Sequence, residues 1–246
     1  MKAVVLGGTA GIGRAVAQRL ATRGDTVFLL GRNADDLERS AADLTARHPH
    51  QERAGWALCD LDDPVSFGAA LDAADRALAQ FDAVIVTAAM FATQDALESD
   101  PELTRRLTTT NFANTVTFCE HARPRLLARG GGWLTVVSSV AGDRGRKPVG
   151  IYGASKAGVS AYLEALDHKY RAAGLWALCV KPGFVKTAMT AGLTPPPFAG
   201  EPDGVARDIV RAMDRKLPLI YTPGIWRLVM FVIKHLPRVV MRRIGF

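Results

Sequence analysis

The chain has 246 residues, of which 48% are hydrophobic and 22% are charged, as in an ordinary globular protein. This length suits one large α/β domain with a substantial core, which is a simpler arrangement than two domains. The formal net charge of +7 is concentrated in the tail, because seven of the 31 basic residues and none of the 24 acidic residues lie from Arg215 onward.

The position of this charge argues against nucleic-acid binding. The residues before Arg215 carry equal numbers of basic and acidic groups, and the basic tail is mixed with apolar residues rather than with a nucleic-acid motif. The three cysteines, Cys59, Cys119 and Cys179, lie in or beside apolar runs and do not have the spacing of metal ligands. We therefore expect no bound metal, and buried thiols in a reducing cytoplasm. The N-terminus does not resemble a signal peptide.

The first segment predicts a strand, a glycine turn and a helix. Ala3–Leu6 is a short apolar run, the glycines follow with the spacing Gly7-xxx-Gly11-x-Gly13, and an amphipathic stretch comes next. This spacing lets backbone amides approach a pyrophosphate at a helix N-terminus. A glycine cluster alone is also compatible with a plain turn, but between a strand and a helix it indicates dinucleotide binding.

The end of the second predicted strand, 26–30, bears on the choice of cofactor. Sites that prefer NAD usually place an acidic residue there to bind the ribose 2′-hydroxyl. Here Gly31 takes that position, and Arg32 follows with a guanidinium that suits a phosphate. The alternative is a solvated surface arginine. We predict NADP(H), with NAD(H) as the less favoured cofactor.

The remaining segments alternate between strand and helix patterns. Strands are predicted at 54–59, 81–87, 133–138, 175–180 and 217–221, and helices at 64–78, 100–129, 152–173 and 202–215, with Pro124 as a candidate kink. This alternation predicts a Rossmann-like, doubly wound α/β fold with a parallel seven-stranded sheet flanked by helices. The Pro/Gly-rich stretch 190–201 is a loop, either a lid over the site or a passive surface connection.

A tyrosine, a lysine and a serine form the candidate catalytic set. Tyr152 and Lys156 stand four residues apart, so a helix beginning there places both side chains on one face. An ammonium beside a tyrosine lowers the phenol pKa from its usual ~10 and makes the phenol a usable general acid or base. The pattern is weak alone, because it is common on solvated helices. Ser139, thirteen residues before Tyr152, strengthens it.

Together these residues resemble the short-chain dehydrogenase/reductase family, in its single-domain form, over about residues 1–222. Ser139, Tyr152 and Lys156 match the family spacing Ser-x12-Tyr-x3-Lys, and residues 6–13 look like its cofactor turn, although Leu6 replaces the usual threonine. One departure follows the fourth strand, where the family's Asn-Asn-Ala-Gly reads Thr87-Ala88-Ala89-Met90. The side-chain hydrogen bonds of those asparagines are therefore lost, and Met90 narrows the floor beside the cofactor.

The resemblance implies hydride transfer between a nicotinamide and a ketone or secondary alcohol carbon. Tyr152 would exchange a proton with the substrate oxygen, which Ser139 would position. Lys156 would lower the Tyr152 pKa and bind the nicotinamide ribose. Asn111 falls where the fourth catalytic residue is expected and would hold a water that links Lys156 to solvent. From the residues alone, an asparagine at this position fits a helix surface.

The same resemblance implies which residues contact the dinucleotide. They are Gly7, Thr9, Ala10, Gly11, Ile12, Gly13, Arg32, Asn33, Asp60, Leu61, Ala88, Ala89, Tyr152, Lys156, Pro182, Gly183, Val185 and Thr187. Thr187 is expected to donate to the nicotinamide carboxamide, and Asp60 to lie near the adenine amino group. The alternative function is a non-catalytic sensor or scaffold that binds the dinucleotide, which would have no need of a tuned phenol.

The segment from Pro223 to Phe246 distinguishes this chain from a minimal family member. It is apolar almost all round a helix, has basic residues every few positions and contains Pro237, so it is not an ordinary spanning helix of ~20 apolar residues. We interpret it as an extension of the domain formed by residues 1–222. It either lies in an anionic membrane interface or covers the substrate pocket or a subunit interface, and the lack of acidic residues slightly favours the membrane.

We accordingly expect a cytoplasmic homo-oligomer that acts on a hydrophobic, or even lipid-like, carbonyl or alcohol, with a contact to the inner face of a membrane if the tail lies in its interface.

Overall fold

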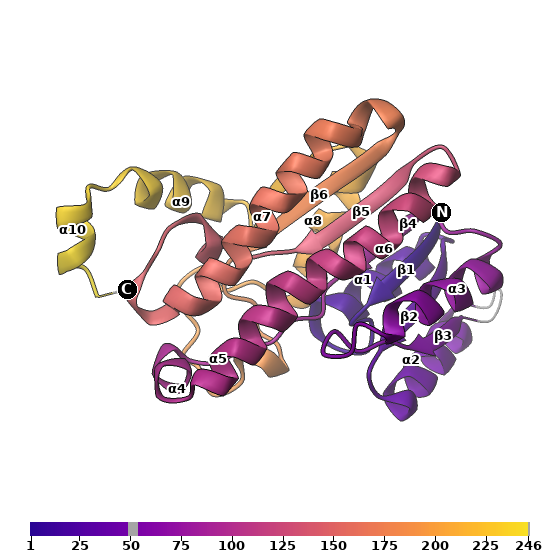
Figure 1. Ribbon diagram of the computed structural model, residues 1–246, viewed down its shortest axis with the longest axis horizontal. Helices are drawn as coiled ribbons and strands as arrows, with labels where there is room; N and C mark the ends of the chain where they lie inside the picture. The colour runs from indigo at the N-terminus through magenta and orange to yellow at the C-terminus, as the bar shows by residue number, and fades with distance from the viewer. Residues whose placement is uncertain (49–53, 246) are drawn as a thin grey trace.

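The computed structural model describes residues 1–48 and 54–245. Its centre is a parallel seven-stranded sheet with the strand order β3-β2-β1-β4-β5-β6-β7 (Figure 1). The strands are β1 (Lys2–Leu6), β2 (Thr26–Gly31), β3 (Gly55–Leu58), β4 (Ala83–Val86), β5 (Gly132–Val137), β6 (Leu175–Pro182) and β7 (Leu219–Thr222). The strand order reverses between β1 and β4, which creates the kind of crevice where open α/β sheets bind ligands.

Helices cover both faces of the sheet. One face carries α1 (Gly11–Thr22), α2 (Ala34–Arg47) and α8 (Pro202–Asp214), and the other carries α3 (Ser66–Leu78), α6 (Thr115–Ala128) and α7 (Gly150–Tyr170). All four residues of β4 are buried, and successive residues face opposite layers: Val84 packs in one core and Ile85 in the other. The predicted doubly wound fold is confirmed.

Most predicted helix ends lie within about three residues of the observed ones, but the helices differ from the predictions in two larger respects. The predicted helix 100–129 is divided into α5 (Pro101–Thr108), a π-helical segment (Thr109–Asn114) and α6, while Pro124 lies inside α6 without ending it. Two further helices, α2 and α4 (Gln94–Ser99), are not among the predicted elements. Each starts at a polar residue whose side chain accepts a backbone N–H three residues on: Asn33 from Asp36 and Thr93 from Ala96.

The three cysteines are free and buried, as predicted. Burial raises the pKa of the Cys59 thiol to about 12 and also raises the pKa values of Cys119 and Cys179. These thiols therefore stay protonated at neutral pH and act as small apolar side chains.

The tail forms two helices, α9 (Ile225–His235) and α10 (Arg238–Arg243), and Pro237 directly precedes the second. Met230 and Ile233 of α9 are buried against Val140, in the turn that follows β5. Figure 1 shows the tail beside the start of α7, at the end of the molecule opposite the N-terminus. Among residues 1–48 and 54–245, no helix is long and apolar enough to cross a bilayer. Phe246 lies outside the described residues.

Candidate active site and cofactor cleft

Ser139 and Tyr152 meet where β5 ends and α7 begins. Ser139 follows β5 and caps the short 3₁₀ turn Val140–Asp143, accepting the Ala141 N–H at 3.1 Å. Its hydroxyl also lies near enough to the Tyr152 phenol to lower the pKa of that phenol. Lys156 lies one turn further along α7 and is only 3% exposed. The structure therefore brings together the three residues that the sequence pattern singled out.

The turn after β5 interlocks with α7, and this contact positions the pair. A Cβ on Gly142 would lie 2.7 Å from the Ala157 nitrogen, and one on Gly153 would lie 2.6 Å from the Ala141 oxygen, so only glycine permits this approach. Ser138 adds a hydrogen bond from its hydroxyl to the Lys156 carbonyl at 2.9 Å. Ser138 was not predicted as a site residue, although it adjoins Ser139 at the same strand end.

The pKa values of Tyr152 and Lys156 correct one expectation. Burial raises the pKa of Tyr152 to about 12, and the Ser139 hydroxyl opposes this rise in part. Burial lowers the pKa of Lys156 to about 8. The prediction that Lys156 lowers the Tyr152 pKa is wrong for this arrangement. The ammonium donates instead to the Val137 carbonyl at 3.0 Å, and it lies 5.8 Å from the centre of the tyrosine ring.

Asn111 is fully buried, so its assignment to a helix surface is wrong. It lies in the π-helical segment, where its Nδ2 donates to the Met90 carbonyl at 2.8 Å and its Oδ1 accepts the Met90 N–H at 2.7 Å. The side chain therefore holds the loop that follows β4, next to the predicted cofactor floor. The water-binding role of Asn111 stays a prediction.

Other side chains of the same π-helical segment hold the turn after β3. Asn114 donates to the Leu61 carbonyl at 2.6 Å, and the Thr110 hydroxyl donates to the Asp62 carboxylate. Asp62 also pairs with Arg106 at 2.6 Å. One irregular segment thus links two loops of the predicted dinucleotide cleft, which agrees with the frequent occurrence of π-bulges at functional sites.

The glycine turn packs against the end of β4. Gly7 has φ +86°, and a Cβ on Gly13 would lie 2.1 Å from the Gly7 oxygen. The Thr87 hydroxyl donates to the carbonyls of Leu6 at 3.0 Å and Gly7 at 3.3 Å. Thr87 therefore supplies its own link between turn and strand at the position where the family has an asparagine.

The start of α1 fits a phosphate group. Ala10 at its N-cap has no side-chain acceptor for the first N–H groups, and no acidic residue lies in the first turn. Unpaired N–H groups at a helix N-terminus attract anions. Thr187 faces the same turn, because a Cβ on Gly11 would lie 3.2 Å from its Cγ2. The predicted pyrophosphate turn and the predicted nicotinamide segment are therefore adjacent.

At the predicted adenosine end of the cleft, two of the predicted contact residues use their side chains in hydrogen bonds within the protein. Asn33 caps α2 by accepting the Asp36 N–H at 3.0 Å, and Asp60 accepts the Asp62 N–H at 3.0 Å. Arg32 is exposed, and within residues 1–48 and 54–245 it has no hydrogen bond or ion pair. Since Asp62 is paired with Arg106, the Arg32 guanidinium remains available for an anionic ligand.

The tail reaches this cleft through Trp226. A Cβ on Gly183 would lie 2.0 Å from the Trp226 Nε1, so the indole packs directly on the predicted nicotinamide segment. The Trp226 Nε1 also donates to the Phe198 carbonyl at 3.4 Å, which joins the tail to the 190–201 loop. This contact was not predicted, because nothing in the local pattern of the tail indicates which surface it covers.

A buried charge pair connects the turn after Ser139 to the last two strands. Lys181 of β6 lies 2.5 Å from the Asp143 carboxylate, and the Tyr221 hydroxyl of β7 donates to the same carboxylate at 2.7 Å. Lys181 is 8% exposed and the Asp143 side chain 1% exposed. The three residues therefore hold the turn that presents Ser139, and the sequence pattern gave no sign of this network.

Known proteins resemble this chain in sequence and in fold. The family model described as short chain dehydrogenase matches residues 1–197. An uncharacterized oxidoreductase of Mycobacterium tuberculosis is 30% identical over 246 residues, covering 98% of this chain and 95% of that protein. A cis-4-hydroxycyclohexanecarboxylate dehydrogenase of Sinomonas cyclohexanicum is 32% identical over 194 residues, covering 78% of this chain and 76% of that protein.

A solved structure of an actinorhodin polyketide ketoreductase with NADPH shares the fold, with a TM-score of 0.80 at 22% identity over 89% of this chain and 94% of that one. The fold, the juxtaposed serine, tyrosine and lysine, and the family match lead to one conclusion. The chain belongs to the short-chain dehydrogenase family and is an NAD(P)-dependent oxidoreductase.

Proposed function

We propose that the protein transfers hydride between NADP(H) and the carbonyl or carbinol carbon of a hydrophobic substrate, with Tyr152 as general acid or base. The observation that carries this proposal is the placement of the Ser139 hydroxyl beside the Tyr152 phenol, whose pKa it lowers, next to a buried Lys156. A hydroxyl and a phenol in contact form a pair that can both bind one substrate oxygen and exchange a proton with it.

When bound, the dinucleotide supplies or accepts the hydride at its nicotinamide ring. In the reductive direction Tyr152 donates its proton to the oxygen of the carbonyl that is being reduced. The phenol is protonated at neutral pH and so has a proton to donate, although its raised pKa makes it a weaker acid than an ordinary tyrosine. Ser139 donates a hydrogen bond to the same oxygen and so stabilises the negative charge that develops there.

Several features of the chain support binding of the cofactor. The start of α1 would hold the pyrophosphate, and the 183–187 segment would hold the nicotinamide. Arg32 would bind the 2′-phosphate that distinguishes NADP(H) from NAD(H), since its guanidinium is exposed and has no ion-pair partner among the described residues.

Aromatic and apolar side chains beside Tyr152 support a hydrophobic substrate. The Phe91 ring contacts the Tyr152 ring edge to face, with 5.2 Å between ring centres. Met90 precedes it in the loop held by Asn111. These side chains offer the substrate carbon skeleton an apolar wall next to the proton donor.

The rival hypothesis is a non-catalytic sensor that binds the dinucleotide, and one comparison separates the two. We expect the protein to consume NADPH with a panel of hydrophobic ketones. Tyr152→Phe should abolish turnover and leave NADPH binding nearly intact, whereas Lys156→Ala should impair both. No consumption with any ketone, or the same turnover by the Phe variant, would count against Tyr152 as the acid.

We further propose a cytoplasmic homo-oligomer. The three free, buried thiols fit a reducing compartment. The edge strand β7 leaves Leu219 exposed, with Leu217 just before it, which offers an apolar strip for contact with a second copy. Size-exclusion chromatography with light scattering checks the oligomer, and a monomer at micromolar concentration would contradict it.

A further inference from the structure

The two tail helices are tied to the turn that presents Ser139. Apart from the contact of Met230 and Ile233 with Val140, two basic residues of the 144–147 loop donate to carbonyls of the tail. Arg144 binds the Leu236 oxygen at 3.0 Å, and Lys147 binds the Arg242 oxygen at 2.8 Å. The inner side of the tail therefore packs on the loop that runs from Ser139 to the start of α7.

The opposite side of the tail is apolar and exposed. Leu228 and Phe231 are 62% and 63% exposed, so most of each side chain faces solvent. We call the exposed apolar residues of the two tail helices the outer face; they are Ile225, Leu228, Phe231, Val232, Val239 and Val240. Soluble monomers rarely expose a contiguous apolar surface of this kind without a partner.

The charged side chains that the tail itself carries all have one sign. No acidic residue lies between Arg215 and the end of the chain. The structure corrects one part of the charge argument, because Arg215 and Lys216 precede β7 while the tail follows its other end. Lys216 lies 4.7 Å above the Trp176 ring, at the start of β6. The five basic residues that follow β7 belong to the tail, as the outer face does: Arg227, Lys234, Arg238, Arg242 and Arg243.

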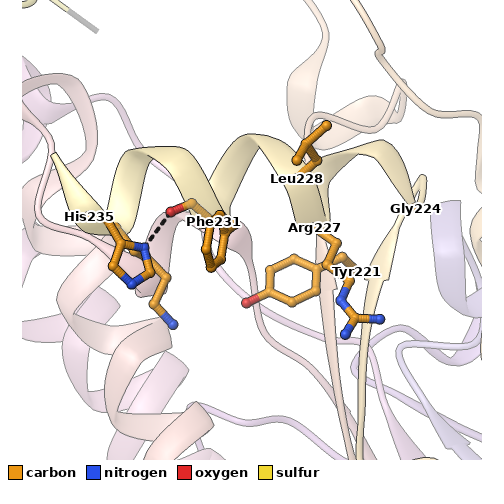
Figure 2. Close-up of a pocket in the computed structure, with 7 residues that line it drawn as sticks. Tyr221, Gly224, Arg227, Leu228, Phe231 and His235 are labelled. Carbon is orange, nitrogen blue, oxygen red and sulfur yellow. Dashed lines mark hydrogen bonds between the residues drawn. The ribbon is translucent and has the colours of Figure 1, made fainter.

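A groove of about 450 Å³ beside α9 is lined by both apolar and cationic side chains (Figure 2). Its lining includes the phenol of Tyr221, the ring of Phe231 and the cationic side chains of Arg227 and Lys234. Among residues 1–48 and 54–245, neither cation has an ion-pair partner. An anionic headgroup with an attached hydrocarbon chain matches this pairing of cations with an apolar surface.

We propose that the outer face docks on the surface of an anionic lipid bilayer. Leu228, Phe231 and Val232 enter the interface, and the basic residues bind lipid phosphates. Because the inner side of the same helices contacts the turn after Ser139, docking places the substrate region next to the bilayer. The docking itself does not depend on the reductase function, so either one can fail in experiment without the other.

Co-sedimentation with vesicles tests the proposal on the full-length protein. The probes are vesicles of phosphatidylcholine alone and vesicles in which phosphatidylglycerol replaces part of the phosphatidylcholine. We expect the protein to sediment with the anionic vesicles at low salt, to sediment less at high salt because the charges are screened, and to stay in solution with the neutral vesicles.

Matched pairs of variants locate the contact. Arg227→Gln with Lys234→Gln should weaken binding roughly 30-fold, as expected for two lost lipid contacts, while Arg215→Gln with Lys216→Gln removes the same charge elsewhere and should have little effect. Leu228→Ser with Phe231→Ser should remove the salt-resistant part of the binding. Val65→Ser with Leu58→Ser is its control, because these exposed residues lie outside the tail.

Three results would overturn the proposal. One is a protein that remains in the supernatant with anionic vesicles at low salt. Another is equal loss of binding in the two charge variants, since this would show an unspecific response to net charge. The third combines two measurements: the wild type binds no vesicles, and the Leu228→Ser, Phe231→Ser variant fails to oligomerise on size-exclusion chromatography. The outer face would then bind a second copy of the chain instead of a bilayer.

Discussion

Replacing Lys156 by methionine should change how the stability of the protein depends on pH. Burial holds the pKa of this ammonium at about 8, against an ordinary value of 10.5. Between these values the unfolded chain keeps a proton that the folded protein has released, so the free energy of unfolding of the wild type rises with pH. The rise from this group is about 1 kcal/mol by pH 9 and about 2.5 kcal/mol by pH 10.

The assay is urea denaturation of the wild type and the Lys156→Met variant between pH 7.5 and about 10. Tyr152 has the opposite sign, because its raised pKa contributes stability that is lost as pH rises above 10. Both proteins retain Tyr152, so its effect cancels in the difference. Lys169→Met is the control, since Lys169 is exposed on the same helix. If the wild type and Lys156→Met curves run parallel, the buried ammonium does not have the lowered pKa and the reasoning is refuted.

Three further substitutions test separate parts of the structure. Arg32→Ala should weaken NADPH binding by roughly 1.5–3 kcal/mol and leave NADH binding unchanged, as measured by titration. Equal affinities of the unmutated protein for NADPH and NADH would contradict this. Asn111→Ala leaves both Met90 backbone groups unpaired and should lower the free energy of unfolding by about 2–5 kcal/mol, and a loss below about 1 kcal/mol would show that the two bonds do not hold the loop. Asp143→Asn leaves the buried Lys181 ammonium without its charge partner and should lower the free energy of unfolding by about 3–5 kcal/mol. An unchanged urea midpoint would show that this pair does not stabilise the fold.

The predictable part of the site consists of residues whose roles follow from short-range spacing. Ser139, Tyr152 and Lys156 come together because one ends a strand and the other two share one helix face. The glycine turn is predictable for the same reason. Helix α2 was also within reach, since Leu37, Ala41 and Leu44 are buried at helical spacing, although it was not predicted.

The rest depends on contacts between distant segments, which no local pattern contains. Asn111 sits among threonines that suit an exposed surface, and only its bonds to Met90, twenty-one positions away, explain its burial. The direction of the Tyr152 pKa shift depends on how deeply the phenol and Lys156 are buried and on which carbonyl the ammonium reaches. The sequence alone did not show that Lys216 lies apart from the charges of the tail, because this depends on the path of β7 between them.

Transfer of a deuterium label tests the central claim most directly. NADPH with deuterium in place of both hydrogens at C4 of the nicotinamide would be mixed with a hydrophobic ketone and the wild-type protein, and the alcohol analysed by mass spectrometry. We predict deuterium on the carbinol carbon with the wild type, and no product with Tyr152→Phe while that variant still binds NADPH. Unlabelled alcohol, or labelled alcohol formed at the wild-type rate by the Tyr152→Phe variant, would contradict hydride transfer with Tyr152 as the proton donor.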